Sequence, residues 1–152
     1  MEKMSDARAR QLISVDRKLY QQQPNNILYA IHALQLAKEY AFQTPLWAQH
    51  AVENCYTDIL NINSKDDHPS ALMDALKIDG RFFKQFHEDK DLYFAAFDMM
   101  LMEGANKKPV AIYKQLAKKY PQLGVGDTLS KKLRFMLDVL RNVEAFPDPF
   151  SD

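Results

Sequence analysis

The sequence is poor in the residues that build disulfides and tight loops. It has one cysteine, Cys55, so an internal disulfide cannot form. Its four glycines are Gly80, Gly104, Gly124 and Gly126. Neither of the glycine-rich patterns G-x-G-x-x-G and G-x-x-x-x-G-K-[ST] occurs. The chain therefore lacks the sequence patterns most typical of nucleotide-binding loops.

Long apolar runs are missing as well. Charged residues interrupt each hydrophobic stretch before it reaches the roughly 20 residues that span a bilayer. The first six residues, MEKMSD, include three charged side chains, and no apolar segment of a signal peptide follows them. We therefore expect no membrane span and a cytoplasmic location.

The residues that are present favour one helical domain. A chain of 152 residues, 47% of them hydrophobic, has the size of a domain that buries roughly 68–70% of its unfolded surface. Its apolar residues recur at spacings of three and four almost throughout, which is the helical period. We expect an all-α, compact bundle of about six to eight short helices forming a single domain, 1–152. Its expected parts are an acidic helical body at 1–104, a basic helix pair at 105–142 and an extended tail at 143–152.

Prolines, glycines and capping residues set the expected helix ends. Thr44 offers a capping hydroxyl and Pro45 suits the first helical position, while Asp79-Gly80 indicates a stop. The first helix is expected to cover the core from outside. The aromatic and methionine-rich residues 82–102 are expected to be core, with a groove for a partner helix as the alternative. The expected helices are 5–23, 27–40, 45–60, 71–76, 80–88, 91–103, 109–120 and 129–141.

A formal net charge of zero hides an uneven distribution of charge. From Lys107 to Arg141 there are nine basic and two acidic side chains, which gives this stretch +7 and leaves −7 for the rest of the chain. A basic stretch of this kind is typical of a surface that meets an anionic partner such as nucleic acid.

The basic stretch has the pattern of two amphipathic helices around a short turn. Its two apolar stripes are Ile112, Tyr113, Leu116, Ala117 and Tyr120, then Leu129, Leu133, Met136, Leu137 and Leu140. Residues 109–141 resemble a helix-turn-helix, in which a first helix braces a second whose N-terminal residues reach the major groove of DNA. Residues 33–47 also resemble a pattern in uncharacterised bacterial and phage proteins that carry a helical C-terminal segment of this kind.

The helix-turn-helix resemblance implies two sets of nucleic-acid contacts. It places Thr128, Ser130, Lys131 and Arg134 at base edges, and Lys114, Lys118, Lys119 and Lys132 at phosphates. The expected function is that of a small nucleic-acid-binding or regulatory protein of bacterial or phage type, with DNA as its partner.

Two other interpretations stay open. In one, the two helices are ordinary bundle helices whose lysines are merely solvated. In the other, the protein is a non-enzymatic interaction module, such as an inhibitor or assembly adaptor, that binds another protein or forms a homodimer. The tail at 146–150 is expected to be extended and to dock on the body or on a partner.

The sequence indicates no catalytic or metal centre. Its four histidines are scattered, with no His-x-x-x-His or Cys-x-x-Cys spacing. His50 with Glu53 suits a surface pair, Asp66-Asp67-His68 suits a loop with a helix cap, and Cys55 lies on an apolar stripe, where an inert thiol is expected. We expect no enzymatic activity, no cofactor, no metal and no small-molecule substrate.

Overall fold

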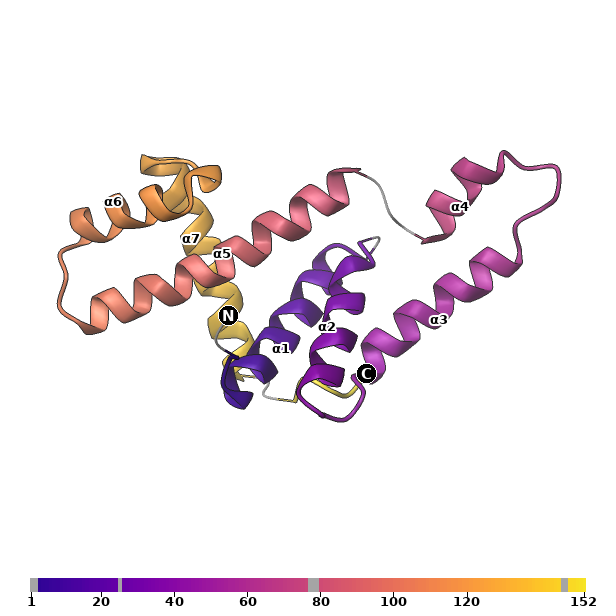
Figure 1. Ribbon diagram of the computed structural model, residues 1–152, viewed down its shortest axis with the longest axis horizontal. Helices are drawn as coiled ribbons and strands as arrows, with labels where there is room; N and C mark the ends of the chain where they lie inside the picture. The colour runs from indigo at the N-terminus through magenta and orange to yellow at the C-terminus, as the bar shows by residue number, and fades with distance from the viewer. Residues whose placement is uncertain (1–2, 25, 77–79, 146–147) are drawn as a thin grey trace. The chain divides into compact units, whose positions relative to one another are not determined.

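The computed structural model describes residues 3–24, 26–76, 80–145 and 148–152, and within these ranges every regular element is a helix (Figure 1). The all-α prediction is confirmed, and the seven α-helices of the described ranges fall within the expected six to eight. The helices of the described ranges are α1 (Asp6–Gln22), α2 (Leu28–Glu39), α3 (Leu46–Leu60), α4 (His68–Leu76), α5 (Gly80–Gly104), α6 (Pro109–Lys119), the 3-10 helix η1 (Pro121–Leu123) and α7 (Gly126–Ala145).

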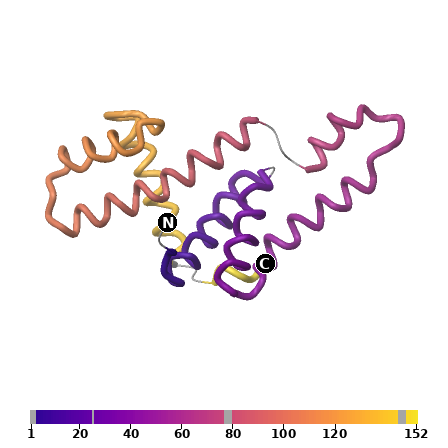
Figure 2. The backbone as a smooth tube through the Cα atoms, in the orientation of Figure 1, coloured from indigo at the N-terminus to yellow at the C-terminus, as the bar shows by residue number. Residues whose placement is uncertain are grey.

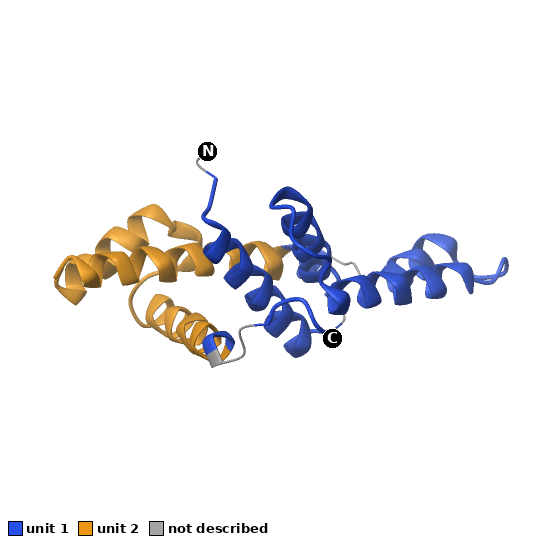
Figure 3. Ribbon diagram, turned by 90° about the horizontal axis from the view of Figure 1, so that it is seen from below, with its two compact units in different colours: residues 1–83, 143–152 blue, residues 84–142 orange. Residues whose placement is uncertain are grey.

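Backbone contacts divide the chain into two compact units, which are coloured separately in Figure 3. Unit 1 comprises residues 1–83 and 143–152, and unit 2 comprises residues 84–142. Most of α5 therefore groups with the basic pair rather than with the rest of the expected acidic body. That all of residues 1–152 act as a single domain stays a prediction.

Helix α1 is more deeply buried than a helix that covers the core from outside, so that prediction is wrong. The hydroxyl of Ser5 accepts a hydrogen bond from the backbone N–H of Arg8 at 3.2 Å and caps the helix. Helix α1 packs along α2, and α2 packs on α3 (Figure 2). The buried residues of α1 lie on more than one side of the helix, which is not the pattern of a helix that covers a core with one face. They are Ala9, Leu12, Ile13, Ser14, Val15, Asp16 and Leu19.

Helices α2 and α3 are less buried than their apolar bands predicted. Ile31 of α2 is 44% exposed. Pro45 is the N-cap of α3 rather than its first helical residue, and no side-chain hydroxyl caps the helix there. The buried side chains of α3 end at Cys55, and the last residue, Leu60, is 84% exposed.

The second half of α3 and the whole of α4 form a helical hairpin joined by residues 61–67, which we call the arm (Figure 1). Helix α4 begins at His68, three residues before the expected start. Ala75 is its one fully buried residue among those described. The arm therefore has little core behind it.

One continuous helix, α5, replaces the two helices expected at 80–88 and 91–103. No glycine or proline stands between Gly80 and Gly104, so nothing in the backbone forces a break at the charged residues 88–91. Tyr93 and Met99 are buried, which places part of the aromatic and methionine-rich segment in the core as expected.

The basic pair forms two helices where the sequence predicts them, but α7 runs from Gly126 to Ala145, past the expected 129–141 and into the tail that was expected to be extended from residue 143. Pro109 is the first residue of α6. Ile112 and Leu116 of α6 are buried, as are Leu129, Leu133, Met136 and Leu140 of α7. Between the helices, η1 buries Leu123, and Gly124 turns the chain with a φ of 90°. A Cβ at Gly124 would lie 3.1 Å from Cγ2 of Thr128, so both the backbone angle and the space favour glycine.

Two further expectations concern membrane-spanning helices and the tail. Among the described residues, no helix combines the length and the apolar character needed to cross a membrane. Residues 148–152 of the predicted tail contact Arg17 and Trp47 of unit 1, and residues 146–147 lie outside the described residues.

Candidate functional site

The candidate site is the basic surface of unit 2, formed by side chains of α6 and α7. The structure separates the eight predicted contact residues by exposure. Lys114, Lys118, Lys119, Thr128, Lys131 and Arg134 are exposed, whereas Ser130 and Lys132 are half-buried. Exposure alone therefore does not separate the phosphate contacts from structural lysines, and the ionic partners must be considered.

Lys119 is held by a carboxylate of α5. Its Nζ donates to Oδ2 of Asp98 at 2.8 Å, and the hydroxyl of Tyr120 donates to the same oxygen at 2.7 Å. Burial, followed by this hydrogen bond, raises the pKa of Tyr120 to about 12, and the hydrogen bond to Asp98 raises the pKa of Lys119. Lys119 is thus a cation whose charge is already balanced inside unit 2.

Lys132 is balanced in the same way, by an ion pair with Glu88 in which the side chains are 32% and 24% exposed. Nearby, Gln122 donates through Nε2 to Oδ2 of Asp91 at 2.9 Å. Three acidic residues of α5, namely Glu88, Asp91 and Asp98, therefore receive donors from α6, η1 and α7. We call these three the acidic platform.

The acidic platform changes the charge that unit 2 presents. Unit 2 contains eleven basic and seven acidic residues, so its formal net charge is +4 rather than the +7 of residues 107–141. The sequence contained a pattern that could have predicted this. Glu88, Asp91 and Asp98 share one face of a helix, and Lys119 and Lys132 each follow a core leucine by three residues.

Four lysines remain on and before α6. None of the four contacts a carboxylate among the described residues; Lys107 Nζ instead donates to Oε1 of Gln115 at 3.3 Å. Lys114 and Lys118 are four residues apart and lie on the outer face of α6, away from the buried Ile112 and Leu116. We call this set the lysine face. It comprises Lys107, Lys108, Lys114 and Lys118.

The outer stripe of α7 carries both signs of charge. At spacings of three and four residues it presents Asp127, Lys131, Arg134, Asp138 and Arg141. Nη1 of Arg141 lies 3.6 Å from Oδ1 of Asp138. Thr128 and Ser130 are two residues apart, so they point to different sides of the helix. Of the four residues assigned to base edges, Lys131 and Arg134 are exposed and three residues apart, while Thr128 lies one turn before Lys131 and the half-buried Ser130 one turn before Arg134.

A hollow of about 330 Å³ lies within unit 2 between α5 and α7. Its lining residues are Gln85, Glu88, Asp89, Leu92, Lys131, Lys132 and Phe135. The carboxylate of Asp89 is buried, and Nε2 of Gln85 donates to its Oδ1 at 3.0 Å. The acids of this hollow, Glu88 and Asp89, are thus engaged with Lys132 and Gln85.

Other titratable groups pair within unit 1. Nδ1 of His32 lies 2.7 Å from Oδ2 of the buried Asp16, a pair that sequence reasoning missed because sixteen residues separate the partners. Nδ1 of His50 lies 2.7 Å from Oδ1 of Asp152, whereas Glu53 accepts from Gln49. The described part of the chain holds no group of three or more His, Cys, Asp or Glu side chains arranged for a metal ion.

Comparison of the chain with protein-family models, with curated proteins and with solved structures found no match in any of the three. The helix-turn-helix resemblance therefore has to be weighed on geometry. Residues 120–125, including η1, separate α6 from α7, whereas the usual turn of that motif has three or four residues. Because the connection is longer than in the motif, the helix-turn-helix resemblance is weak evidence for function. The exposed charges of the surface are stronger evidence.

Proposed function

We propose that the protein binds nucleic acid through the lysine face of α6, with Lys131 and Arg134 of α7 beside it in the same unit. One observation carries the proposal. These cations are exposed and have no carboxylate partner among the described residues, whereas Lys119 and Lys132 are neutralised by the acidic platform. Exposed cations without partners gain most from phosphate, because they displace condensed counterions without first breaking an ion pair.

The proposed binding is directed mainly at the phosphate backbone. The lysine face contains no acidic residue, but the outer stripe of α7 alternates its cations with Asp127 and Asp138. Those carboxylates repel phosphate and limit how closely α7 approaches a groove. We therefore expect affinity that depends strongly on salt and weakly on base sequence. Such a protein would be a small cytoplasmic regulator of bacterial or phage type.

The test is fluorescence anisotropy with labelled duplex DNA over a series of salt concentrations. In the variant Lys114→Ala with Lys118→Ala, the slope of log K against log salt should fall by roughly 2 in magnitude, because each lost phosphate contact removes about 0.9. The matched control is Lys38→Ala with Lys65→Ala, which changes the net charge equally at exposed lysines of unit 1. It should retain most of the wild-type slope.

Two results would refute this proposal. One is the absence of DNA binding by the wild-type protein even at low salt. The other is an equal loss of slope in both double variants, since the effect would then follow net charge and not the lysine face.

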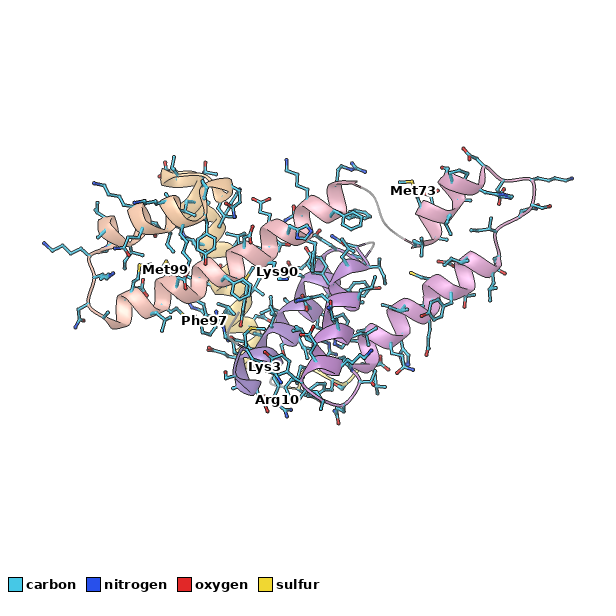
Figure 4. All side chains as sticks on the ribbon, viewed as in Figure 1. Lys3, Arg10, Met73, Lys90, Phe97 and Met99 are labelled. Atoms are coloured by element: carbon cyan, nitrogen blue, oxygen red, sulfur yellow. The ribbon has the colours of Figure 1, made fainter. Side chains whose placement is uncertain are left out.

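A second candidate function is protein binding through the arm. Tyr56, Leu60, Leu72 and Met73, the last labelled in Figure 4, are between 42% and 84% exposed. Large exposed apolar side chains on one hairpin are typical of a protein interface. The variant Leu60→Ser with Met73→Ser should then lose a specific co-purifying protein that the exposed-surface control Ile31→Ser keeps. If both variants keep it, the arm is not its binding site.

A further inference from the structure

The tail, residues 148–152, lies on unit 1 as a bent segment outside any helix, and its backbone carbonyls accept hydrogen bonds from residues of α1 and α3. Three consecutive carbonyls of the tail each accept a hydrogen bond. Arg17 Nη1 donates to the carbonyl oxygen of Asp148 at 3.2 Å, and Trp47 Nε1 donates to that of Pro149 at 3.0 Å. The backbone N–H of Leu46 donates to the carbonyl oxygen of Phe150 at 2.7 Å.

One side chain of the tail is anchored as well. Phe150 is 6% exposed and contacts the edge of Phe42, with ring centroids 5.9 Å apart. The guanidinium of Arg10, labelled in Figure 4, lies 4.3 Å from the centroid of Phe42 and 5.6 Å from that of Phe150. A cation over two aromatic rings stabilises their burial. Phe150 is therefore the apolar anchor of the segment.

The charges around the tail are complementary. Nδ1 of His50 lies 2.7 Å from Oδ1 of Asp152, and Arg17 also donates to Oγ of Ser151 at 3.4 Å. Within the tail, the N–H of Phe150 donates to Oδ1 of Asp148 at 3.0 Å, which holds the turn and lowers the pKa of that carboxyl. The surface is thus basic where the tail is acidic.

These contacts have the properties of a peptide-binding site: backbone recognition, a buried aromatic anchor and charge complementarity. We name it the tail site, formed by Arg10, Arg17, Phe42, Leu46, Trp47 and His50. We propose that the tail site binds extended Asp-Pro-Phe segments and receives the tail of a second copy of this chain when its own tail is displaced. This site is independent of the lysine face.

Two features favour a second copy as the source. Among the described residues, the tail groups that contact the tail site belong to 148–152, so these residues of another copy can make the same bonds. None of these residues belongs to a helix, so lifting the tail breaks no helical hydrogen bond. Exchange of an identical segment is a low-cost route to a dimer. The tethered tail competes at an effective concentration of about millimolar, so the wild-type chain stays mostly closed at micromolar concentration.

The experiment therefore weakens the contact between the tail and the tail site of the same chain. It does so with two different variants of the full-length protein. The site variant, Arg10→Ala with Arg17→Ala, keeps an intact tail. The tail variant, Phe150→Ala, keeps an intact site. In an equimolar mixture, the tail of the first and the site of the second rebuild the wild-type contact between two molecules.

Sedimentation velocity measures the outcome. We expect monomers for each variant alone, and for the mixture a dimer that increases with concentration over tens of micromolar. Monomers alone in the mixture would overturn the proposal. Dimers of equal strength in the mixture and in either variant alone would also overturn it, because association would then lie elsewhere.

A peptide probe keeps the proposal testable if the site variant does not fold. A labelled peptide of residues 143–152 is titrated with the full-length Phe150→Ala protein, and both its anisotropy and the fluorescence of Trp47, the one tryptophan of the chain, are followed. We expect binding at least tenfold tighter than that of the same peptide carrying alanine at its Phe150 position. Equal affinity of the two peptides, or no binding, would overturn the proposal.

Discussion

The two units use their charged residues for different partners. In unit 1, Arg17 and His50 contact the tail, and the bonds join segments about a hundred residues apart, such as Trp47 and Pro149. In unit 2, lysines of α6 and α7 contact side-chain carboxylates of α5, the helix that precedes them. Charge counted along the chain therefore says little about charge at the surface, because each unit neutralises part of it internally.

The largest effect expected from this comparison is in the core of unit 1. Ile13→Ala in α1 should lower the free energy of unfolding by about 2–5 kcal/mol, since Ile13 is fully buried and the cavity cannot close completely. Leu72→Ala in the arm should cost less than about 1 kcal/mol, because Leu72 is already partly in water. Urea unfolding followed by circular dichroism measures both. Equal losses would show that the difference in burial between Ile13 and Leu72 does not determine their contributions to stability.

The acidic platform should give the next largest effect. Asp98→Ala removes the acceptor of both Lys119 and the partly buried hydroxyl of Tyr120, so we expect a loss of about 1–3 kcal/mol. Asp138→Ala is the matched control, because its ion pair with Arg141 is exposed and such pairs contribute about 0–1 kcal/mol. Urea unfolding of the two variants would contradict the role of the platform if Asp98→Ala were as mild as its control.

The same cluster should respond to alkaline pH. The folded-state pKa of Tyr120 is raised to about 12, above the ordinary value of 10.0, so the neutral phenol is favoured in the folded protein. Its contribution to stability is therefore complete below pH 10 and is lost as the pH rises through about 12. Ultraviolet difference titration should show one tyrosine ionising near pH 12 that is missing in Tyr120→Phe. Identical titration curves would exclude this assignment.

The smallest effect should come from the mixed stripe of α7. Arg141→Ala breaks an exposed contact to Asp138, and we expect a change in unfolding free energy within about 0.5 kcal/mol. In the DNA anisotropy assay it should also change affinity less than Lys114→Ala does, because Asp138 already offsets Arg141. A larger loss with Arg141→Ala would move the binding surface from α6 to α7.

Sequence reasoning succeeded where the apolar stripe alone determines the packing. The stripes of α6 and α7 and the start at Pro109 were predicted because the helical period and a first-turn proline are local properties. The extent to which α1 is buried was not predictable in this way. Its polar residue Asp16 is buried because His32 of α2 contacts it, and that contact forms only in the folded protein.

The candidate site shows the same limit. The charge of the basic stretch is visible in the sequence, but which lysines are exposed without partners depends on Glu88 and Asp98, 44 and 21 residues away from Lys132 and Lys119. The sequence predicted two helices in place of α5 because the charged residues 88–91 interrupt its apolar pattern. The partners of these residues, which allow them to lie within one helix, are not visible in the sequence. Local patterns thus located the helices, whereas long-range pairing determined which lysines have no carboxylate partner among the described residues.

The turn at Gly124 has a consequence for how the basic pair responds to its surroundings. The positive φ of Gly124 and the close approach of Thr128 restrict the turn between α6 and α7 sterically. Steric restriction does not depend on salt concentration or pH. The ties from α5 to the same helices are ionic and weaken as salt rises. A change in ionic strength should therefore weaken the contacts of α6 and α7 with α5. The angle between α6 and α7 should stay the same, because steric contacts determine it.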